Sequence, residues 1–172
     1  EQAGWFKIEF VNQQGQQSVL KDGLDITDGT VVDAAFMRVE ALRHFIAEQL
    51  ADAKAKDVLF SVHLKATMMK VSDPIVFGHV VSVLLQGFVT KHQSVLDSIG
   101  FNPNLGLSDL EQRLAGLPAD QRSELESDLA ASLADQPRLF MVDSDRGISN
   151  LHVSSDVIID ASMPALIRAG GR

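Results

Sequence analysis

The chain has 172 residues, of which 45% are hydrophobic and 22% charged, a composition typical of a folded domain rather than of a disordered segment. It contains no Cys and no Tyr, which excludes a disulfide scaffold, a cysteine nucleophile and a phenolic acid or base from this chain. The net charge of −8 without a Lys/Arg cluster argues against nucleic acid as a partner, and no apolar run reaches the ~18 residues of a membrane span. With no export signal in sight, we expect a cytoplasmic protein.

The first 30 residues have the pattern of a β-hairpin. Residues 5–11 alternate apolar and polar side chains from Phe6 onward, which predicts a strand. Residues 13–16 predict a turn, and residues 18–21 are the candidate partner strand. Asp-Gly pairs at 22–23 and 28–29 predict two further turns.

The next part of the chain is predicted to alternate helix and strand. Residues 30–35 have the composition of a short strand or of a lead into a helix. Apolar residues at three- and four-residue spacing make 37–54 the clearest predicted helix. The apolar run 58–64 predicts a buried strand, and a proline suited to a first helical turn predicts a helix over 74–85.

The second half is predicted to be mostly helical, with strands near its end. Residues 101–106 predict a loop, and Ser108 with Glu111 forms a capping-box pattern for a short helix over 108–115. The remaining predicted elements are a helix over 118–133 and strands over 138–142 and 156–160. Because strands and helices alternate, we expect an α/β fold, with α+β packing as the alternative, in a single domain over residues 1–172.

Polar side chains stand at or just after the ends of three of the predicted strands, where open α/β sheets bind their ligands. Lys65 directly follows the strand over 58–64, and its ammonium group suits an anionic substrate or proton relay, although a solvated loop lysine is the commoner role. Asp143 and Asp145 follow the strand over 138–142, and Asp160 ends the last strand. Carboxylates are the ligands that Mg²⁺ and Mn²⁺ prefer, although turn formation or helix capping is the commoner role of each one singly.

Two long strings in these segments are more specific than any short motif. The first runs over residues 58–75 and reads VLFSVHLKATMMKVSDPI. The second runs over residues 141–153 and reads MVDSDRGISNLHV, and it continues over 156–165 as DVIIDASMPA. Both strongly resemble the monomeric NADP-dependent isocitrate dehydrogenase family, and the resemblance covers nearly the whole chain.

The resemblance implies a portion of the large domain of an isocitrate/isopropylmalate dehydrogenase-like fold, with a mixed sheet flanked by helices. It implies oxidative decarboxylation of isocitrate to 2-oxoglutarate, with NADP and with Mg²⁺ or Mn²⁺. By its place in the first string, Lys65 matches the substrate-binding, proton-relaying lysine of the family. Asp160 matches a metal-binding aspartate, and Asp143 and Asp145 are weaker candidates for that role.

The chain also departs from the family pattern. Ser154 stands where the family resemblance implies a proline, and no tyrosine is present to act as the family's acid. The family's NADP-binding region and its other substrate-binding groups lie outside the matched strings. We therefore expect a fragment that needs the remainder of the enzyme chain and is inactive alone. The alternative is a stand-alone, family-derived binding or dimerisation module without catalysis, which would associate with itself.

Overall fold

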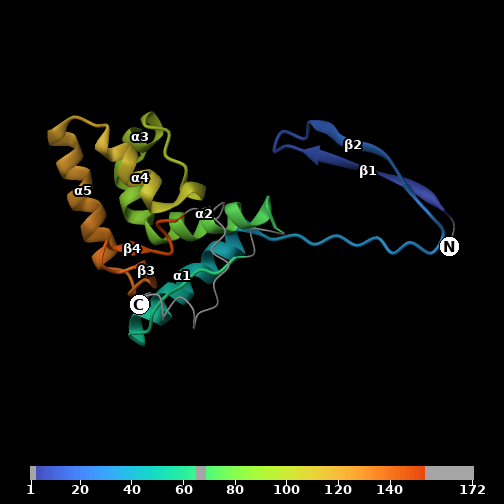
Figure 1. Cartoon of the computed structure of the whole chain (residues 1–172). Helices are drawn as coiled ribbons and strands as arrows, with labels where there is room; N and C mark the ends of the chain where they lie inside the picture. Colours follow the sequence, from blue (N-terminus) through green and yellow to red (C-terminus); the bar gives the residue numbers. More distant parts are fainter. Residues whose placement is uncertain (1–2, 65–68, 154–172) are drawn as a thin grey trace. The chain divides into compact units, whose positions relative to one another are not determined.

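The computed structural model describes residues 3–64 and 69–153. The chain divides into two compact units, one that ends at Phe36 and one that begins at Met37, and each is described by itself. The elements are helices and small antiparallel sheets, so the predicted mixture of α and β structure is confirmed at that level (Figure 1).

The first unit is a β-hairpin, as predicted. Strand β1 (Gly4–Val11) pairs antiparallel with β2 (Gln17–Ile26), which is longer than the predicted partner. The turn predicted at 22–23 is wrong, because this pair lies inside β2 where the register with β1 shifts. Gly23 has a φ of 65°, which is typical of the glycine in a β-bulge. The turn predicted at 28–29 is confirmed.

One face of the hairpin is richer in apolar side chains than the other. Because side chains alternate along a strand, Phe6, Ile8 and Phe10 of β1 share one face, and the register adds Leu24 and Ile26 of β2 to it. The opposite face is mixed, because Trp5 and Val11 share it with an ion pair between Lys7 Nζ and Glu9 Oε1, which lie 2.6 Å apart. None of the described side chains of this unit is buried, so the unit's own residues leave the face with Phe6, Ile8 and Phe10, here called the apolar face, uncovered.

The second unit is mainly helical. Its helices are α1 (Val39–Ala55), α2 (Ser72–Leu84), α3 (Gln86–Ser98), the 3₁₀ helix η1 (Pro103–Leu105), α4 (Gly106–Ala115) and α5 (Ala119–Ala134). The helices predicted over 37–54, 74–85 and 118–133 are confirmed with end shifts of one or two residues. Helix α3 was not predicted, although Phe88, His92 and Leu96 recur at four-residue spacing and are buried. Residues 30–38 are irregular, so 30–35 is a lead into α1 and not a strand.

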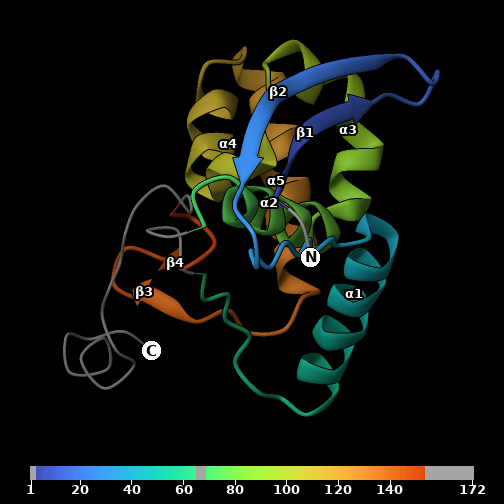
Figure 2. The ribbon, with the colours of Figure 1, turned by 90° about the vertical axis from the view of Figure 1, so that its right-hand side faces the viewer.

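Helix α2 lies at the centre of this unit, where it contacts α1, α3, α4 and η1 (Figures 1 and 2). Its Val81 and Leu84 are almost fully buried and join Phe88 of α3 and Leu110 of α4 in one core. Burial of each such side chain stabilises the fold by roughly 1.5–3 kcal/mol. Among the described residues no single helix is long and apolar enough to cross a membrane; α2 and α3 meet that criterion only as a pair, and the pair is bent by 104°.

Glycines allow two close approaches in this packing. A Cβ atom at Gly78 of α2 would overlap the side chain of Asn104 in η1, so η1 reaches this helix only because residue 78 lacks a side chain. Gly106 begins α4 with a φ of 81°, and a Cβ there would lie 2.8 Å from the carbonyl oxygen of Leu151.

The capping box predicted for Ser108 and Glu111 is wrong, because α4 begins two residues earlier. The first amides of α4 are satisfied by another segment: the N–H of Leu107 donates to the Leu151 carbonyl at 2.9 Å, and the N–H of Ser108 donates to the His152 carbonyl at 3.2 Å. This contact fixes the chain that follows the last described strand against the start of α4.

The predicted strands of the second unit are shorter than expected. Phe60 and Leu139 form an isolated parallel bridge, in which Phe60 N–H donates to the Arg138 carbonyl and Phe140 N–H donates to the Phe60 carbonyl, each at 2.8 Å. Residues 61–64 have no regular structure, so the strand predicted over 58–64 is reduced to this bridge. Strand β3 (Met141–Asp143) pairs antiparallel with β4 (Ile148–Ser149). The strand predicted over 156–160 lies outside the described residues.

Candidate functional site

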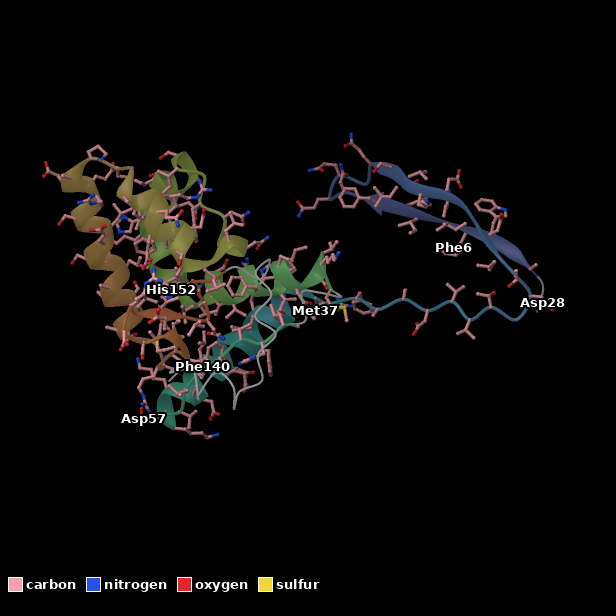
Figure 3. The ribbon with its side chains drawn as sticks, in the orientation of Figure 1. Phe6, Asp28, Met37, Asp57, Phe140 and His152 are labelled. Atoms are coloured by element: carbon pink, nitrogen blue, oxygen red, sulfur yellow. The ribbon has the colours of Figure 1, made fainter. Side chains whose placement is uncertain are left out.

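The two strings that resemble the isocitrate dehydrogenase family lie side by side in the second unit. The parallel bridge between Phe60 and Leu139 joins the first string to the chain that enters β3. The ring of His63 lies against that of Phe140, with centroids 6.4 Å apart. Phe140 itself is 3% exposed, so it anchors this junction in the core (Figure 3).

A side-chain amide makes a second connection between the strings. The Nδ2 atom of Asn150, just after β4, donates to Ser61 Oγ and to the Val62 carbonyl, at 2.9 Å in both cases. Ser61 and Val62 come four and three residues before Lys65 in the sequence. The segment that enters the candidate lysine is thus tied to the β3–β4 hairpin.

The ring of His152 fixes the chain after β4 to helix α4 (Figure 3). Its Nδ1 accepts hydrogen bonds from the Ser149 N–H at 3.0 Å and from Ser149 Oγ at 2.7 Å. A backbone N–H is always a donor, so the neutral ring carries its proton on Nε2, which lies 3.4 Å from Glu111 Oε1. Burial lowers the pKa of His152, and the Glu111 carboxylate opposes this effect.

The order Ser149, His152, Glu111 has the contacts of a hydrolase triad but not its exposure. Ser149 is 1% exposed, and its Oγ lies 3.3 Å from the N–H of Leu151, which donates to it. A nucleophile must reach a substrate carbonyl, and this hydroxyl is enclosed by its own turn. The three residues therefore hold the chain in place rather than attack a substrate.

The predicted site residues have different outcomes. Lys65 and Asp160 lie outside the described residues. Asp143 ends β3, and its Oδ1 accepts the N–H of Arg146 at 3.2 Å, while Asp145 is exposed in the same turn. Asp143 thus closes the turn between β3 and β4, which is the commoner role weighed for it from the sequence.

The described carboxylates do not by themselves form a metal centre. Over residues 3–64 and 69–153, no three His, Asp or Glu side chains are grouped so that they hold a metal ion. Asp143 and Asp145 offer the hard oxygen donors that Mg²⁺ and Mn²⁺ prefer, but Asp143 is engaged by the backbone of its own turn.

Two other polar features of the second unit belong to neither string. Asp128 Oδ2 on α5 accepts from Lys91 Nζ at 2.6 Å and from His92 Nε2 at 2.7 Å, which links α5 to α3. A hollow of about 270 Å³ between α1, the end of α2 and the start of α3 is lined by Arg43, His44, Ala47, Ser82, Val83 and Gln86. The first feature is a structural cross-link, and the second lacks any residue that the sequence assigned to chemistry.

Comparison with known proteins shows that this chain is similar to isocitrate dehydrogenases. The model of the family described as "Monomeric isocitrate dehydrogenase" matches residues 1–172. The isocitrate dehydrogenase [NADP] of Azotobacter vinelandii is 51% identical over 169 residues, which are 98% of this chain and 23% of that protein. The isocitrate dehydrogenase [NADP] 2 of Mycobacterium tuberculosis is 51% identical over 166 residues, which are 96% of this chain and 22% of that protein.

The chain belongs to the monomeric isocitrate dehydrogenase family, so the resemblance stated from its two strings is confirmed. It spans less than a quarter of the length of these curated relatives, at 22–23%.

Sequence reasoning missed the residues that join the two strings. Asn150 stands in the second string but carries no local pattern, because its partners are 88 and 89 residues away in the sequence. The capping-box pattern predicts that Glu111 caps the start of a helix, whereas its carboxylate faces His152. Only the fold brings these side chains together.

Proposed function

We propose that this chain is a segment of the large domain of a monomeric NADP-dependent isocitrate dehydrogenase. In the family-length enzyme it contributes part of the site that converts isocitrate to 2-oxoglutarate. The observation that carries the proposal is the family match over residues 1–172. The contact of the two strings through Asn150 and the Phe60–Leu139 bridge supports it.

Lys65 is the proposed catalytic and substrate-binding residue. Its ammonium group would balance the negative charge of isocitrate and relay a proton during the reaction. Asp160 is the proposed metal-binding residue, with Asp143 and Asp145 as weaker candidates. The divalent metal, when bound, polarises substrate oxygens, and NADP accepts the hydride at a region of the family enzyme beyond this segment.

The remainder of the enzyme chain is the proposed partner. A two-stranded hairpin is marginally stable at best in water, and the hairpin of the first unit leaves Phe6, Ile8 and Phe10 uncovered by its own residues. The two curated relatives contain much more chain than the segment matched here, which is only 22–23% of their length. We propose that the corresponding chain of the family-length enzyme covers the apolar face. We propose that the 172 residues act within a single large domain of a cytoplasmic enzyme.

The alternative is a stand-alone binding or dimerisation module. The same uncovered face favours it, because a second copy also offers an apolar surface. Sedimentation of the isolated chain separates the two proposals. A fragment that lacks its partner segments shows weak or open-ended association, whereas a module gives one stable dimer at micromolar concentration.

Activity is tested in an exchanged enzyme, in which this chain replaces the 169 matched residues of the Azotobacter vinelandii protein. We expect NADPH formation from isocitrate and Mn²⁺ by the exchanged enzyme and none by the isolated chain. Lys65→Met should lower kcat by at least ~100-fold, the range for loss of an acid–base group. Lys70→Met, which removes an exposed ammonium group from the same string, is the matched control and should keep kcat. An unchanged kcat in Lys65→Met contradicts the proposed role.

A further inference from the structure

The side chain of Asn150 reaches the chain between Phe60 and Lys65 with two hydrogen bonds. Beyond the bridge at Phe60, residues 61–64 have no regular structure. Within the part of the chain that the structure describes, Asn150 supplies the side-chain hydrogen bonds that reach this segment, one to Ser61 Oγ and one to the Val62 carbonyl. Both N–H groups of the amide are therefore used on the same short segment.

Asn150 is itself held on both sides. Its backbone N–H donates to the Phe140 carbonyl at 2.9 Å, which ties it to the chain entering β3. The carbonyls of the next two residues, Leu151 and His152, accept the first amides of α4. The amide of Asn150 thus extends from a fixed backbone, which makes it a suitable anchor for a segment without regular structure.

The carbonyl oxygen of the Asn150 side chain shows that packing alone does not explain why an asparagine stands at this position. Asn150 Oδ1 is buried and has no hydrogen-bond partner among the described residues. A buried carbonyl oxygen without a partner is costly, and a leucine would fill a similar volume without that cost. The reverse orientation of the amide is excluded, because the Val62 carbonyl cannot donate, so the amide atom that faces it must be the donor Nδ2.

We propose that Asn150 is a positioning residue for Lys65. The proposal rests on the proposed function of Lys65 in the family-length enzyme. Val62 stands three residues before Lys65 in the sequence, so the hydrogen bond from Asn150 restrains the backbone at most about 11 Å along the chain from that lysine. A misplacement of about 1 Å costs on the order of 100-fold in rate when geometry supplies the catalysis.

The test compares three variants in the exchanged enzyme. Asn150→Ala removes both donors, and Asn150→Asp keeps the shape but places a carboxylate oxygen against the Val62 carbonyl. Asn102→Ala is the matched control, because Asn102 Oδ1 accepts the N–H of Asn104 within the η1 turn and touches neither string. The measurements are kcat, KM for isocitrate, the pH profile of kcat, and hydrogen exchange of the amides of residues 61–64.

We expect both Asn150 variants to lower kcat at least tenfold, with a smaller change in KM, and to speed amide exchange in 61–64. We also expect them to shift by at least half a pH unit the limb of the pH profile that Lys65→Met removes. A residue that only stabilises the fold does not move that limb, and Asn102→Ala should lower the melting temperature while keeping kcat and the profile.

The outcomes separate this inference from the proposed function. If Lys65→Met loses activity while a folded Asn150 variant keeps kcat and its pH profile, the inference is wrong and the proposed function stands. If Lys65→Met keeps kcat, the proposed role of Lys65 fails, and the positioning role of Asn150 fails with it. If Asn150→Ala does not fold, Asn150→Asp and its pH profile decide.

Discussion

The Nε2 atom of His152 lies 3.4 Å from Oε1 of Glu111, and the opposite nitrogen of the ring accepts from Ser149. Burial lowers the pKa of His152 below its ordinary value of 6.5, so the unfolded chain takes up a proton that the folded chain resists. The neutral, buried His152 ring therefore contributes fully to the stability of the fold above pH 6.5. This contribution is lost progressively as the pH falls through 6.5 towards the folded-state pKa.

The first prediction concerns this pH dependence. Thermal unfolding of the isolated chain, followed by circular dichroism from pH 7.5 to 5.5, should show a falling melting temperature. His152→Gln should make that fall shallower, because glutamine does not titrate. His44→Gln is the control, since the His44 side chain is 74% exposed, and it should leave the slope unchanged. An equal slope in His152→Gln and the parent chain contradicts the prediction.

The second prediction concerns Asp128, which joins α5 to α3. Hydrogen bonds from Lys91 and then His92 lower the pKa of Asp128 below its ordinary value of 3.8. Its contribution is therefore present above pH 3.8 and is lost as the pH falls through the lower, folded-state pKa. Asp128→Asn should destabilise the chain at pH 7 because His92, which is 7% exposed, loses its charged partner.

Urea unfolding at pH 7 and pH 3 measures this effect. The difference between Asp128→Asn and the parent should shrink at the lower pH. Asp97→Asn removes an exposed carboxylate that pairs with Gln93 on α3, and it should change stability at neither pH. A difference that is as large at pH 3 as at pH 7 would show that the charge of Asp128 plays no part.

Local patterns predicted the helices well, because an apolar stripe at helical spacing is a property of consecutive residues. They failed where a distant segment decides the structure. The start of α4 is set by the carbonyls of Leu151 and His152 rather than by Ser108. The bulge at Gly23 has the dipeptide signature of a turn, and only its pairing with β1 distinguishes the two.

The candidate site shows the same division. The two strings identify the family, and they contain Lys65, Asp143 and Asp145. The sequence of the strings does not reveal which polar side chains join one string to the other. The role of Asp143 follows from its position in a turn of only a few residues, so the sequence anticipated it. The role of Asn150 requires the fold, because Ser61 and Val62 are 89 and 88 residues away in the sequence and the parallel bridge at Phe60 lies next to this contact.

The third prediction concerns the close approach of η1 to α2. Gly78→Ala should lower the free energy of unfolding by about 1–3 kcal/mol, because the new methyl group overlaps the side chain of Asn104. Gly87→Ala in α3 is the matched control, since a Cβ there meets nothing within 4 Å. It should leave stability unchanged or raise it by up to ~1 kcal/mol, as for glycine to alanine in a helix. Urea unfolding of both variants checks the pair, and equal effects would mean that η1 moves aside without cost.

The fourth prediction concerns the apolar face of the hairpin, on which Phe6 is labelled (Figure 3). Ile8 lies on this face and is 47% exposed, whereas Val19 pairs with Glu9 on the opposite face and is 53% exposed. If the remainder of the family-length protein covers the apolar face, Ile8→Ser should destabilise the exchanged enzyme by about 1.5–3 kcal/mol. Val19→Ser should have a much smaller effect.

The same variants in the isolated chain show which residues cover the apolar face. There Ile8→Ser should cost little, because the segments that bury Ile8 are missing, and chemical unfolding of both proteins measures the difference. Equal destabilisation of the isolated chain and the exchanged enzyme would mean that the 172 residues already cover the face themselves. A loss of dimer in the isolated chain on Ile8→Ser, without an effect in the exchanged enzyme, would instead favour the stand-alone module, because the face would then serve a second copy.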